Sequence, residues 1–300
     1  MKNIFVYGSL NTDFTLELPK KIKMGETLKA DKLIISFGGK GANQAYAAKK
    51  MGGEVYMLGD VGNDIQGKSM IKNLAEIGIR TEGISIHKEE KSGIAMITLF
   101  DQNNEIIVYP GANLLSKHQK VQKVLNQFSH VYDYFVFQFE KKLMDIETTL
   151  HMARSKKLYT VCNPSPMDKA FVLKIAHHID LLVINETEYE TITEKPFDYH
   201  APMRNLNELH MLGFMDAIIT MGEHGVVAVI DSYKYLFKAP KVEVVDTTGA
   251  GDTFLGSYIS LVSQGYEVKD ALEMATKAAS ISVTQYGAQT SMPSKKDMDT

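Results

Sequence analysis

The segment from residue 241 to residue 262 constrains the fold of this chain more than any other. Its first part, Lys241–Val245, alternates in polarity and is rich in valine, which predicts a β-strand. Its last part has apolar residues at helical spacing, which predicts an α-helix. These residues are Phe254, Leu255, Tyr258, Ile259, Leu261 and Val262. A strand joined to a helix by a short turn is the repeating unit of α/β proteins.

The turn itself, Gly249, Ala250 and Gly251, carries a chemical signal. Small residues let the backbone approach a ligand, and a helix start presents unpaired N–H groups to it. Such a turn stabilises phosphate charge that grows during a reaction. Asp252 follows directly, although a carboxylate repels an anion, and a role in removing a hydroxyl proton would explain it. The alternative is that Asp252 only caps the helix. The glycines on both sides of Ala250 favour the catalytic interpretation.

Helix and strand patterns alternate through most of the remaining chain. Ala42–Met51 is predicted to be a helix that Gly52 and Gly53 end, and a second helix is predicted over about residues 67–77. Short apolar runs predict strands at Met1–Gly8, Val55–Leu58, Tyr134–Phe137, Leu158–Val161, Leu181–Ile184 and Ala217–Thr220. This alternation predicts a central, mostly parallel sheet with helices on both faces, a three-layer α/β/α fold.

Two regions depart from the alternation. Strand patterns at Asp13–Leu18 and Lys32–Ile35 have no helix between them, and Gly93–Phe100 and Ile106–Tyr109 form a hairpin around Asp101–Asn104. Strands without helices predict a small second sheet that projects from the main one. We therefore expect a single domain over residues 1–300, with a subdomain from about residues 12–36 and 92–110.

Composition and charge exclude several classes of function. The net charge of −3 and the isoelectric point near 6.3 give no electrostatic reason to expect a nucleic-acid partner. Cys162 is the only cysteine, which excludes intrachain disulfides and thiolate metal clusters. The N-terminus reads as a strand rather than a signal peptide, and no run approaches the ~18 apolar residues of a membrane span. We expect a cytoplasmic protein with no membrane partner.

Motifs spread along the whole chain resemble one known family. Val245–Phe254 resembles the C-terminal signature of the ribokinase-like sugar kinases, the phosphofructokinase-B family, and Phe37–Ala45 resembles its partner signature. Further matches are Gly8–Asp13, Pro110–Asn113, Asn163–Pro166, Asn185–Glu188, Thr220–Gly222 and Gly287–Gln289. Each is weak alone, but together and in this order they make a specific resemblance.

The resemblance implies a ribokinase-like fold whose small sheet is a lid over the sugar and also forms a homodimer contact. It implies ATP-dependent phosphorylation of the primary hydroxyl of a pentose, with D-ribose converted to D-ribose 5-phosphate as the first expectation. Related kinases act on 2-deoxyribose, nucleosides or ketoses, and these alternatives remain open. A non-catalytic, sugar-binding regulator is a more distant alternative, against which the intact Asp252 and its glycine turn argue.

Polar residues after the first strand form the expected sugar site. Asp13 can accept hydrogen bonds from two neighbouring hydroxyls, while Asn11 can both donate and accept. Gly39 lets the backbone come close, Lys40 is the only cation, and Asn43 adds an amide. One positive charge suits a neutral polyol better than a sugar phosphate. The resemblance adds Glu140 as a further hydroxyl ligand. Taken alone, Asn11 and Asp13 could form an Asx-turn, and Asn43 could be a cap.

The nucleotide site rests mainly on the resemblance, because the chain has neither a Walker P-loop nor a G-x-G-x-x-G motif. The family pattern places Asn185 and Glu188 near the phosphates and Mg²⁺, with Glu188 acting through ordered water. It also places Thr220, Gly222 and Gly225 around the nucleotide, Gly251 at its phosphates, and Thr276 beside the adenine, where relatives often carry Asn or His. Taken alone, Glu186 and Glu188 are more often solvated acids at a helix start.

The resemblance also implies a K⁺ site beside the glycine turn, built mostly from backbone carbonyls. Its residues are Asp246, Thr248, Ser282, Gln285, Gly287 and Ser291. Hard oxygen ligands with one carboxylate suit a weakly charged cation, and an occupied site would stiffen the turn that receives phosphoryl charge. The alternative is that Asp246 only caps the turn.

Overall fold

The core of the protein is a nine-stranded sheet with the strand order β13-β12-β11-β10-β9-β8-β1-β4-β5. The computed structural model describes residues 1–101 and 103–298. The strands are β1 (Asn3–Tyr7), β4 (Glu54–Gly62), β5 (Arg80–His87), β8 (Tyr134–Gln138), β9 (Tyr159–Asn163), β10 (Leu181–Asn185), β11 (Asp216–Thr220), β12 (Val226–Ile230) and β13 (Tyr233–Phe237). From β5 to β11 all neighbours are parallel, and β12 and β13 add an antiparallel edge.

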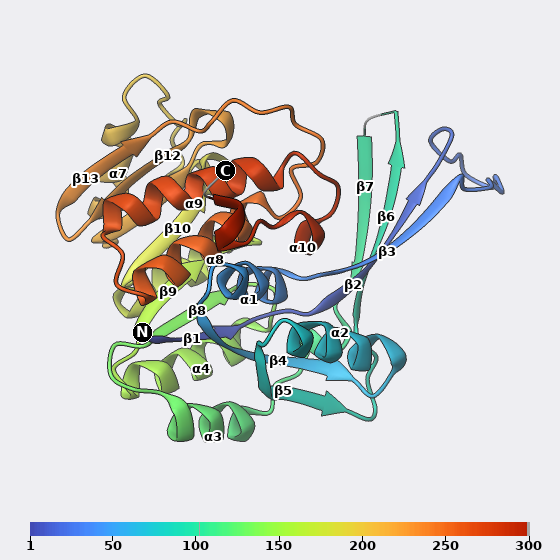
Figure 1. The fold of residues 1–300 in the computed structure, drawn as a ribbon, viewed down its shortest axis with the longest axis horizontal. Helices are drawn as coiled ribbons and strands as arrows, with labels where there is room; N and C mark the ends of the chain where they lie inside the picture. The colour runs from blue at the N-terminus through green and yellow to red at the C-terminus, as the bar shows by residue number, and fades with distance from the viewer. Residues whose placement is uncertain (102, 299–300) are drawn as a thin grey trace.

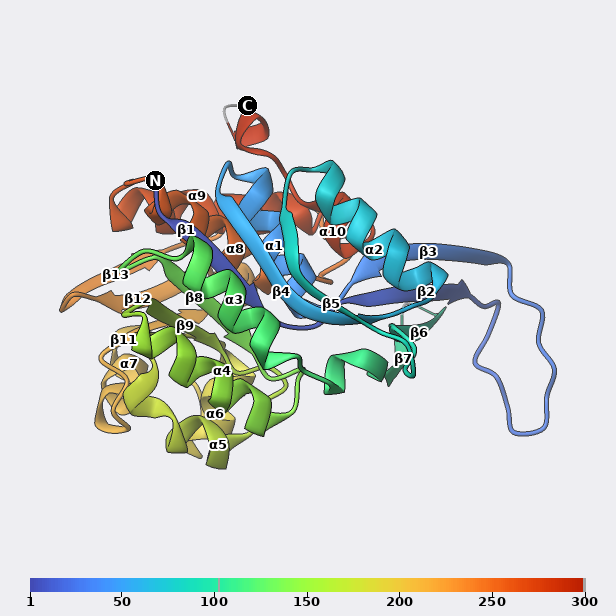
Figure 2. The same ribbon diagram turned by 90° about the horizontal axis from the view of Figure 1, so that it is seen from below.

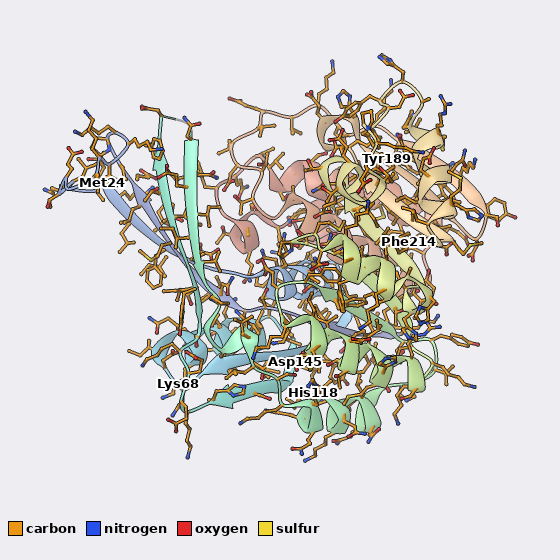
Figure 3. All side chains as sticks on the ribbon, turned by 180° about the vertical axis from the view of Figure 1, so that it is seen from behind. Met24, Lys68, His118, Asp145, Tyr189 and Phe214 are labelled. Atoms are coloured by element: carbon orange, nitrogen blue, oxygen red, sulfur yellow. The ribbon has the colours of Figure 1, made fainter. Side chains whose placement is uncertain are left out.

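Helices cover both faces of this sheet, which confirms the predicted three layers (Figure 1, Figure 2). One apolar cluster joins the sheet to α1 (Lys40–Lys50), α2 (Ile65–Glu76), α8 (Ala250–Ser263) and α9 (Val268–Ser282). The other joins the opposite face to α3 (His118–Phe128), α4 (Leu143–Ser155), α5 (Lys169–Lys174), α6 (Glu186–Thr193) and α7 (Pro202–Met211). Figure 3 shows Tyr189 and Phe214, both fully buried, within this second layer.

The second sheet has four strands in the order β3-β2-β6-β7 and projects from one end of the main sheet (Figure 1). Its strands are β2 (Asn11–Glu17), β3 (Lys32–Gly38), β6 (Gly93–Phe100) and β7 (Asn103–Tyr109). The sequence predicted all four, although β7 begins earlier than expected, and Gln102 of the predicted turn lies outside the described residues. The connection from residue 18 to residue 31 extends away from the body, with Met24 fully exposed (Figure 2, Figure 3).

The predicted strand at Lys241–Val245 is wrong. The sheet ends at β13, and residues 238–249 form an irregular connection in which Val242, Val244 and Val245 are exposed. The N–H groups of Val245 and Asp246 both donate to the carbonyl of Val283, which anchors the connection to the end of α9. Alternating valines favour a strand only where a neighbouring strand supplies hydrogen-bond partners. Among the described residues, no strand pairs with this segment. The helix after the turn was predicted correctly.

The N-terminal halves of α1 and α8 lie in very close contact. A Cβ atom added at Gly256 would stand 2.4 Å from the carbonyl oxygen of Gln44 and 2.6 Å from the Cβ of Ala47. A Cβ at Gly41 would stand 2.7 Å from the Cα of Gly8, so α1 also lies directly on the end of β1. Glycine is therefore required where these backbones meet, and the starts of α1 and α8 come to one place. Among the described residues, no helix is long and apolar enough to cross a membrane.

This close contact predicts that Gly256→Ala destabilises the protein, although alanine is the better helix former. The added methyl group would force α1 and α8 apart, and overpacking of this kind costs about 1–3 kcal/mol. Urea unfolding followed by circular dichroism measures the free energy of unfolding.

Gly251→Ala is the matched control, because Gly251 lies on the same helix and an added Cβ there meets nothing within 4 Å among the described residues. It should leave stability unchanged or raise it by up to about 1 kcal/mol, as helix propensity predicts. Equal stability of the two variants would contradict the packing argument.

Candidate active site

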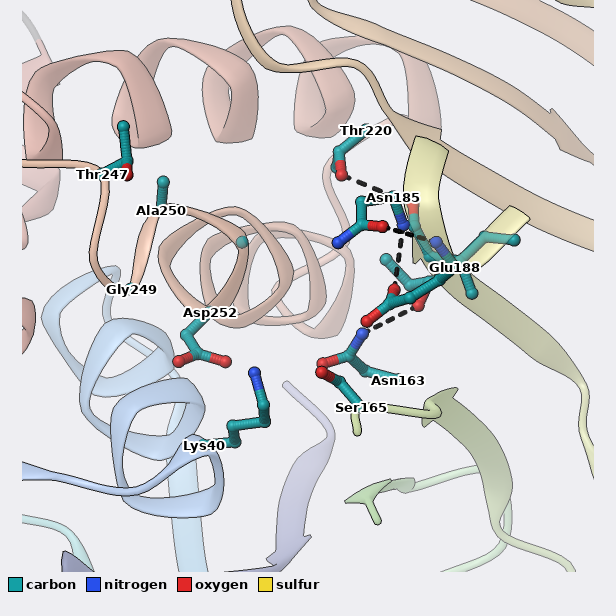
Figure 4. A pocket seen from close by; sticks show the side chains of 13 residues that line it. Lys40, Asn163, Ser165, Asn185, Glu188, Thr220, Thr247, Gly249, Ala250 and Asp252 are labelled. Atoms are coloured by element: carbon teal, nitrogen blue, oxygen red, sulfur yellow. Dashed lines mark hydrogen bonds between the residues drawn. The ribbon is translucent and has the colours of Figure 1, made fainter. Parts of the chain in front are cut away.

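A pocket of about 220 Å³ lies at the carboxyl ends of β9, β10 and β11, where the starts of α1, α6 and α8 meet (Figure 4). Ligands bind at this edge in open α/β sheets. Its lining residues are Lys40, Asn163, Ser165, Val183, Ile184, Asn185, Glu188, Thr220, Thr247, Gly249, Ala250, Gly251 and Asp252. Beside the pocket, a hydrogen bond joins Asn43 and Asp252, which are 209 residues apart in the sequence.

The glycine turn has the backbone geometry of an anion site. Gly249 is the N-cap of α8 with φ of 76°, a left-handed conformation that favours glycine. The first full helical hydrogen bond runs from the N–H of Thr253 to the carbonyl of Gly249. The N–H groups of Gly251 and Asp252 therefore precede it, and neither has a hydrogen-bond partner among the described residues, so a ligand could accept from them. A Cβ at Gly251 would meet nothing within 4 Å among the described residues, so the backbone there is open to the pocket.

Asp252 does not cap its own helix. It lies two residues after the first residue of α8, is 8% exposed, and accepts hydrogen bonds from α1 instead. Asn43 Nδ2 donates to Asp252 Oδ2 at 3.0 Å, and Gln44 Nε2 donates to Asp252 Oδ1 at 2.9 Å. The capping alternative is therefore wrong. A buried carboxylate held by neutral amides next to an open anion site is suited to accept a proton from a reacting hydroxyl.

Lys40, the first residue of α1, extends into the pocket near Asp252 (Figure 4). Burial by itself would lower the pKa of Lys40, but the carboxylates of Asp252, Glu140 and Glu188 outweigh it and raise that pKa above its usual value. The side chain is thus a fixed cation between the glycine turn and Glu188. Its position suits an anionic group bound beside the glycine turn.

The predicted sugar residues are brought together at the junction of the two sheets. Asn11 begins β2, and its Oδ1 accepts from Asn113 Nδ2 at 2.8 Å. The backbone N–H of Lys40 donates to Glu140 Oε2 at 3.0 Å, so Glu140 occupies the start of α1. Gly39 has φ of 87°, and a Cβ there would stand 2.9 Å from the N of Asn11. The glycine thus allows β2 and the start of α1 to touch.

Asp13 has a raised pKa. Burial, and then the nearby carboxylate of Glu140, raise the pKa of Asp13 to about 6. Its carboxylate lies against the backbone of Gly38, where a Cβ would stand 2.1 Å from Oδ2. Lys40 lies near Glu140, but no hydrogen bond or ion pair to the Asp13 carboxylate is present among the described residues. Neighbouring hydroxyls of a polyol would supply donors to it.

Asn185 and Glu188 form a reciprocal cap at the start of α6. Glu188 N donates to Asn185 Oδ1 at 2.8 Å, and Asn185 N donates to Glu188 Oε2 at 3.0 Å. This capping box explains why an acidic residue is buried there. Glu188 Oε1 has no hydrogen-bond partner among the described residues. Thr220, at the end of β11, lines the same part of the pocket.

Three residues predicted for the nucleotide lie outside the pocket lining. Gly222 and Gly225 bound the 3-10 turn η3 (Gly222–His224) directly after β11, and a Cβ at Gly225 would stand 1.9 Å from the carbonyl oxygen of Phe237. Thr276 is buried on α9, where its hydroxyl donates to the carbonyl of Leu272 at 2.8 Å. Their contact with a nucleotide stays a prediction.

Asp246 contacts two of the other residues predicted to hold K⁺, Thr248 and Gly287. Asp246 Oδ1 accepts from the N–H of Thr248, and Oδ2 accepts from the N–H of Gly287, both at 2.9 Å. This carboxylate therefore ties the glycine turn to the segment after α9. Ser282, the last residue of α9, is buried, and the segment after it contains Gln285, which is exposed, and Ser291, which is buried. The described residues contain no group of three or more His, Cys, Asp or Glu side chains that could hold a metal ion. A site made mostly of backbone carbonyls does not require such a group.

Sequence reasoning missed several residues that shape the pocket. Asn163, Ser165 and Thr247 line it, and Gln44 binds Asp252, yet none was assigned a role. Asn163 and Ser165 belong to a motif of the resemblance, and Gln44 stands beside Asn43, so the motifs held a signal. Without the tertiary contact, a glutamine inside a helix gives no sign of its partner.

A model of the pfkB family of carbohydrate kinases matches residues 1–295. The chain belongs to this family. It is a carbohydrate kinase. Its α/β/α fold, with a small second sheet, is that of the family's solved structures.

Similar proteins cover almost the whole chain. The ribokinase of Haemophilus influenzae is 32% identical over 99% of this chain and 97% of its own length. The deoxyribokinase of Salmonella typhi is 33% identical over 97% of this chain and 96% of its own. The structure of Arabidopsis thaliana ribokinase complexed with ribose and ATP has a TM-score of 0.89 and 27% identity. It covers 99% of this chain and 97% of that one.

The raised pKa of Asp13 predicts that Asp13→Asn stabilises the folded protein at high pH. The folded state binds the Asp13 proton up to about pH 6, whereas an unfolded aspartate releases it near pH ~3.9. The stability contributed by that proton is present at low pH and lost as the pH rises through about 6. We expect the variant to exceed the wild type by on the order of 2 kcal/mol at pH 8 and by less at pH 5.

Urea unfolding at the two pH values measures this difference. Thr15→Val, two residues along β2, removes no titratable group, so its effect should be the same at pH 5 and pH 8. A gain from Asp13→Asn that does not change with pH would contradict the assigned charge state.

Proposed function

We propose that this kinase transfers the γ-phosphoryl group of ATP to the primary hydroxyl of a pentose, and that D-ribose is converted to D-ribose 5-phosphate. The observation that carries the proposal is the position of Asp252. It lies between the open backbone of the glycine turn and the sugar-side residues of α1, with its carboxylate buried. The ribokinase relatives and the ribose and ATP in the Arabidopsis structure support the choice of substrates.

The chemistry follows from the residues around Asp252. As the sugar oxygen attacks the γ-phosphorus, Asp252 accepts the hydroxyl proton and the bond to the ADP oxygen breaks. The N–H groups of Gly251 and Asp252 and the ammonium of Lys40 stabilise the charge on the transferred phosphoryl oxygens. Asn11, Asp13 and Glu140 orient the sugar ring through its hydroxyls.

Mg²⁺ is part of the proposal, and the acceptor oxygens around the pocket fit it. Glu188 would hold the ion through ordered water by Oε1, the oxygen outside the capping box, with Asn185 beside it. Oxygen ligands that leave several waters in place are those Mg²⁺ prefers. When bound, the ion would neutralise charge on the nucleotide phosphates.

The small sheet is the proposed lid and the proposed homodimer contact. Asp13, Ala95 and Val108 are neighbours in register and share the face toward the site. The opposite face carries an apolar row in register, and its members are Phe14, Ile35, Met96 and Ile107. Ile35 and Ile107 are exposed by more than half, so a second copy packed on this face would bury them. A cytoplasmic location follows from the use of ATP.

The second candidate substrate is 2-deoxyribose, because the Salmonella typhi deoxyribokinase is 33% identical to this chain and the Haemophilus influenzae ribokinase is 32% identical. If Asp13 binds a pair of vicinal ring hydroxyls, loss of one hydroxyl leaves a buried acceptor unmatched, at about 1–3 kcal/mol. We therefore expect kcat/KM to be higher for ribose than for 2-deoxyribose by roughly 5- to 150-fold. A panel that also includes ketoses and nucleosides, with ADP release as the measurement, tests the function.

Two variants give this experiment its controls. Asp13→Ala should remove the preference between the two pentoses. Asp252→Asn should lower kcat by about 10²–10⁴-fold and leave ribose affinity, measured by calorimetry, largely intact. Equal kcat/KM for both pentoses would favour a deoxyribokinase, and turnover of no sugar would refute the proposed function.

K⁺ is the proposed monovalent activator, held by Asp246 and the carbonyl oxygens of its loop. We expect kcat to rise when K⁺ replaces tetramethylammonium at constant ionic strength. The reason is that occupancy would hold the turn that carries the donor N–H groups. The increase in kcat should stay below roughly 10²-fold, which is the effect of removing one hydrogen-bond donor from an oxyanion hole. ADP is measured directly, so that no coupling enzyme responds to the cation.

Asp246→Asn is the informative variant, since it keeps a side-chain oxygen for the N–H of Thr248 or Gly287 but loses the charge. Its kcat should no longer respond to K⁺. A wild-type rate that stays flat across the exchange of cations would show that no such site acts here.

A further inference from the structure

Two series of buried amide side chains converge on Asp252. In the first, Gln138 Nε2 donates to Gln44 Oε1 at 2.5 Å, and Gln44 Nε2 donates to Asp252 Oδ1 at 2.9 Å. The same Gln44 nitrogen also donates to Asn163 Oδ1 at 3.1 Å. Gln44 is 1% exposed and Gln138 is fully buried. Every hydrogen-bonding group of the Gln44 amide except one acceptor lone pair is thus used.

The second series reaches the other oxygen of the same carboxylate. Asn73 Nδ2 donates to Gln289 Oε1 at 2.9 Å, and Gln289 Nε2 donates to Asn43 Oδ1 at 3.2 Å. Asn43 Nδ2 then donates to Asp252 Oδ2 at 3.0 Å. Each oxygen of the carboxylate therefore accepts one N–H from a neutral amide, and both amides come from consecutive residues of α1.

The direction of these bonds is fixed from outside the series. Asn163 Nδ2 donates to the carbonyl of Val183 at 3.0 Å, so its Oδ1 must face Gln44. Gln138 likewise offers an N–H to the oxygen of Gln44. Both contacts orient the amide nitrogen of Gln44 toward Asp252. Gln138 Oε1 is buried without a hydrogen-bond partner among the described residues, but both N–H groups of Gln44 are used. Rotation of the Gln44 amide would take the donors away from Asp252 and Asn163, so these contacts hold one arrangement of Gln44.

We propose that Gln44 is a positioning residue for the phosphoryl-transfer step, which holds the plane of the Asp252 carboxylate so that a free lone pair faces the acceptor hydroxyl. This role rests on the proposed function. A neutral donor suits it, since an amide orients the carboxylate without neutralising the charge that attracts the proton. The network extends the site to β8, which contributes Gln138, and joins Asn163 of β9 to Gln44.

The test replaces Gln44 by methionine, which has a similar length and no donor. We expect kcat to fall about 100-fold, the size of effect that small misplacement of a reacting group produces. KM values for ribose and ATP should change by less than threefold, because Gln44 touches neither substrate pocket directly. Gln44→Glu keeps the shape and serves as the second variant if Gln44→Met folds poorly. It should lose kcat similarly, since an ionised glutamate offers no donor to Asp252.

A double-mutant cycle with Asp252→Asn separates positioning from a purely structural role. If Gln44 acts through Asp252, Gln44→Met should lower the residual kcat of Asp252→Asn by less than threefold, a strongly non-additive result. Gln264→Met is the matched control at the other end of the same helix pair. There Gln264 Nε2 donates to the carbonyls of Met51 and Ser260. It should lower Tm while kcat stays within twofold.

The outcomes distinguish this inference from the proposed function. A wild-type enzyme that turns over no sugar refutes the proposed function. An active wild type together with a Gln44→Met variant that keeps kcat within threefold, or with additive effects in the cycle, refutes the positioning role alone. A large fall in kcat with steady KM values and a non-additive cycle supports it.

Discussion

The contact between α1 and α8 is the constraint on which the rest of the structure depends. The two helices approach so closely at Gly256 that the backbone carbonyl of Gln44 leaves no space for a side chain. Helix α1 begins after Gly39, beside the residues predicted to bind the sugar, and α8 begins at the glycine turn. The contact between the helices therefore brings these two parts of the pocket together. It also places Asn43 and Gln44 within hydrogen-bond reach of Asp252. A looser helix pair would separate Asp252 from the amides that donate to it.

The site gathers acidic groups at the expense of stability. Asp13 and Glu140 face one another closely enough to shift the pKa of Asp13, and Lys40 stands among the carboxylates of Asp252, Glu140 and Glu188. Burial of like charges opposes folding, which is typical of binding sites whose donors arrive with the ligand. The surrounding apolar layers supply the stability that the site lacks, because they lie on both faces of the main sheet.

Much of the fold could be predicted from periodicity, since buried strands and amphipathic helices carry local signals. The failure at Lys241–Val245 shows the limit of this reasoning. Its alternating valines look like a strand, but the antiparallel hairpin β12–β13 already ends the sheet, so the segment has no partner and stays exposed. Edge position is a property of the assembled sheet, and no pattern within five residues encodes it.

The sequence by itself determined which residue types are available to the site. The glycines at a helix start, the aspartate that follows them and the order of the motifs could each be recognised from neighbouring residues alone. It named Asp252, Asn43 and the glycine turn, and it indicated a sugar kinase. Only the tertiary structure decided how these groups act on one another. The bonds from Gln44 to Asp252 and from Gln289 to Asn43 span 208 and 246 residues, and the pKa of Asp13 depends on Glu140 across the fold. Such interactions depend on distance in space, which residue spacing along the chain does not specify.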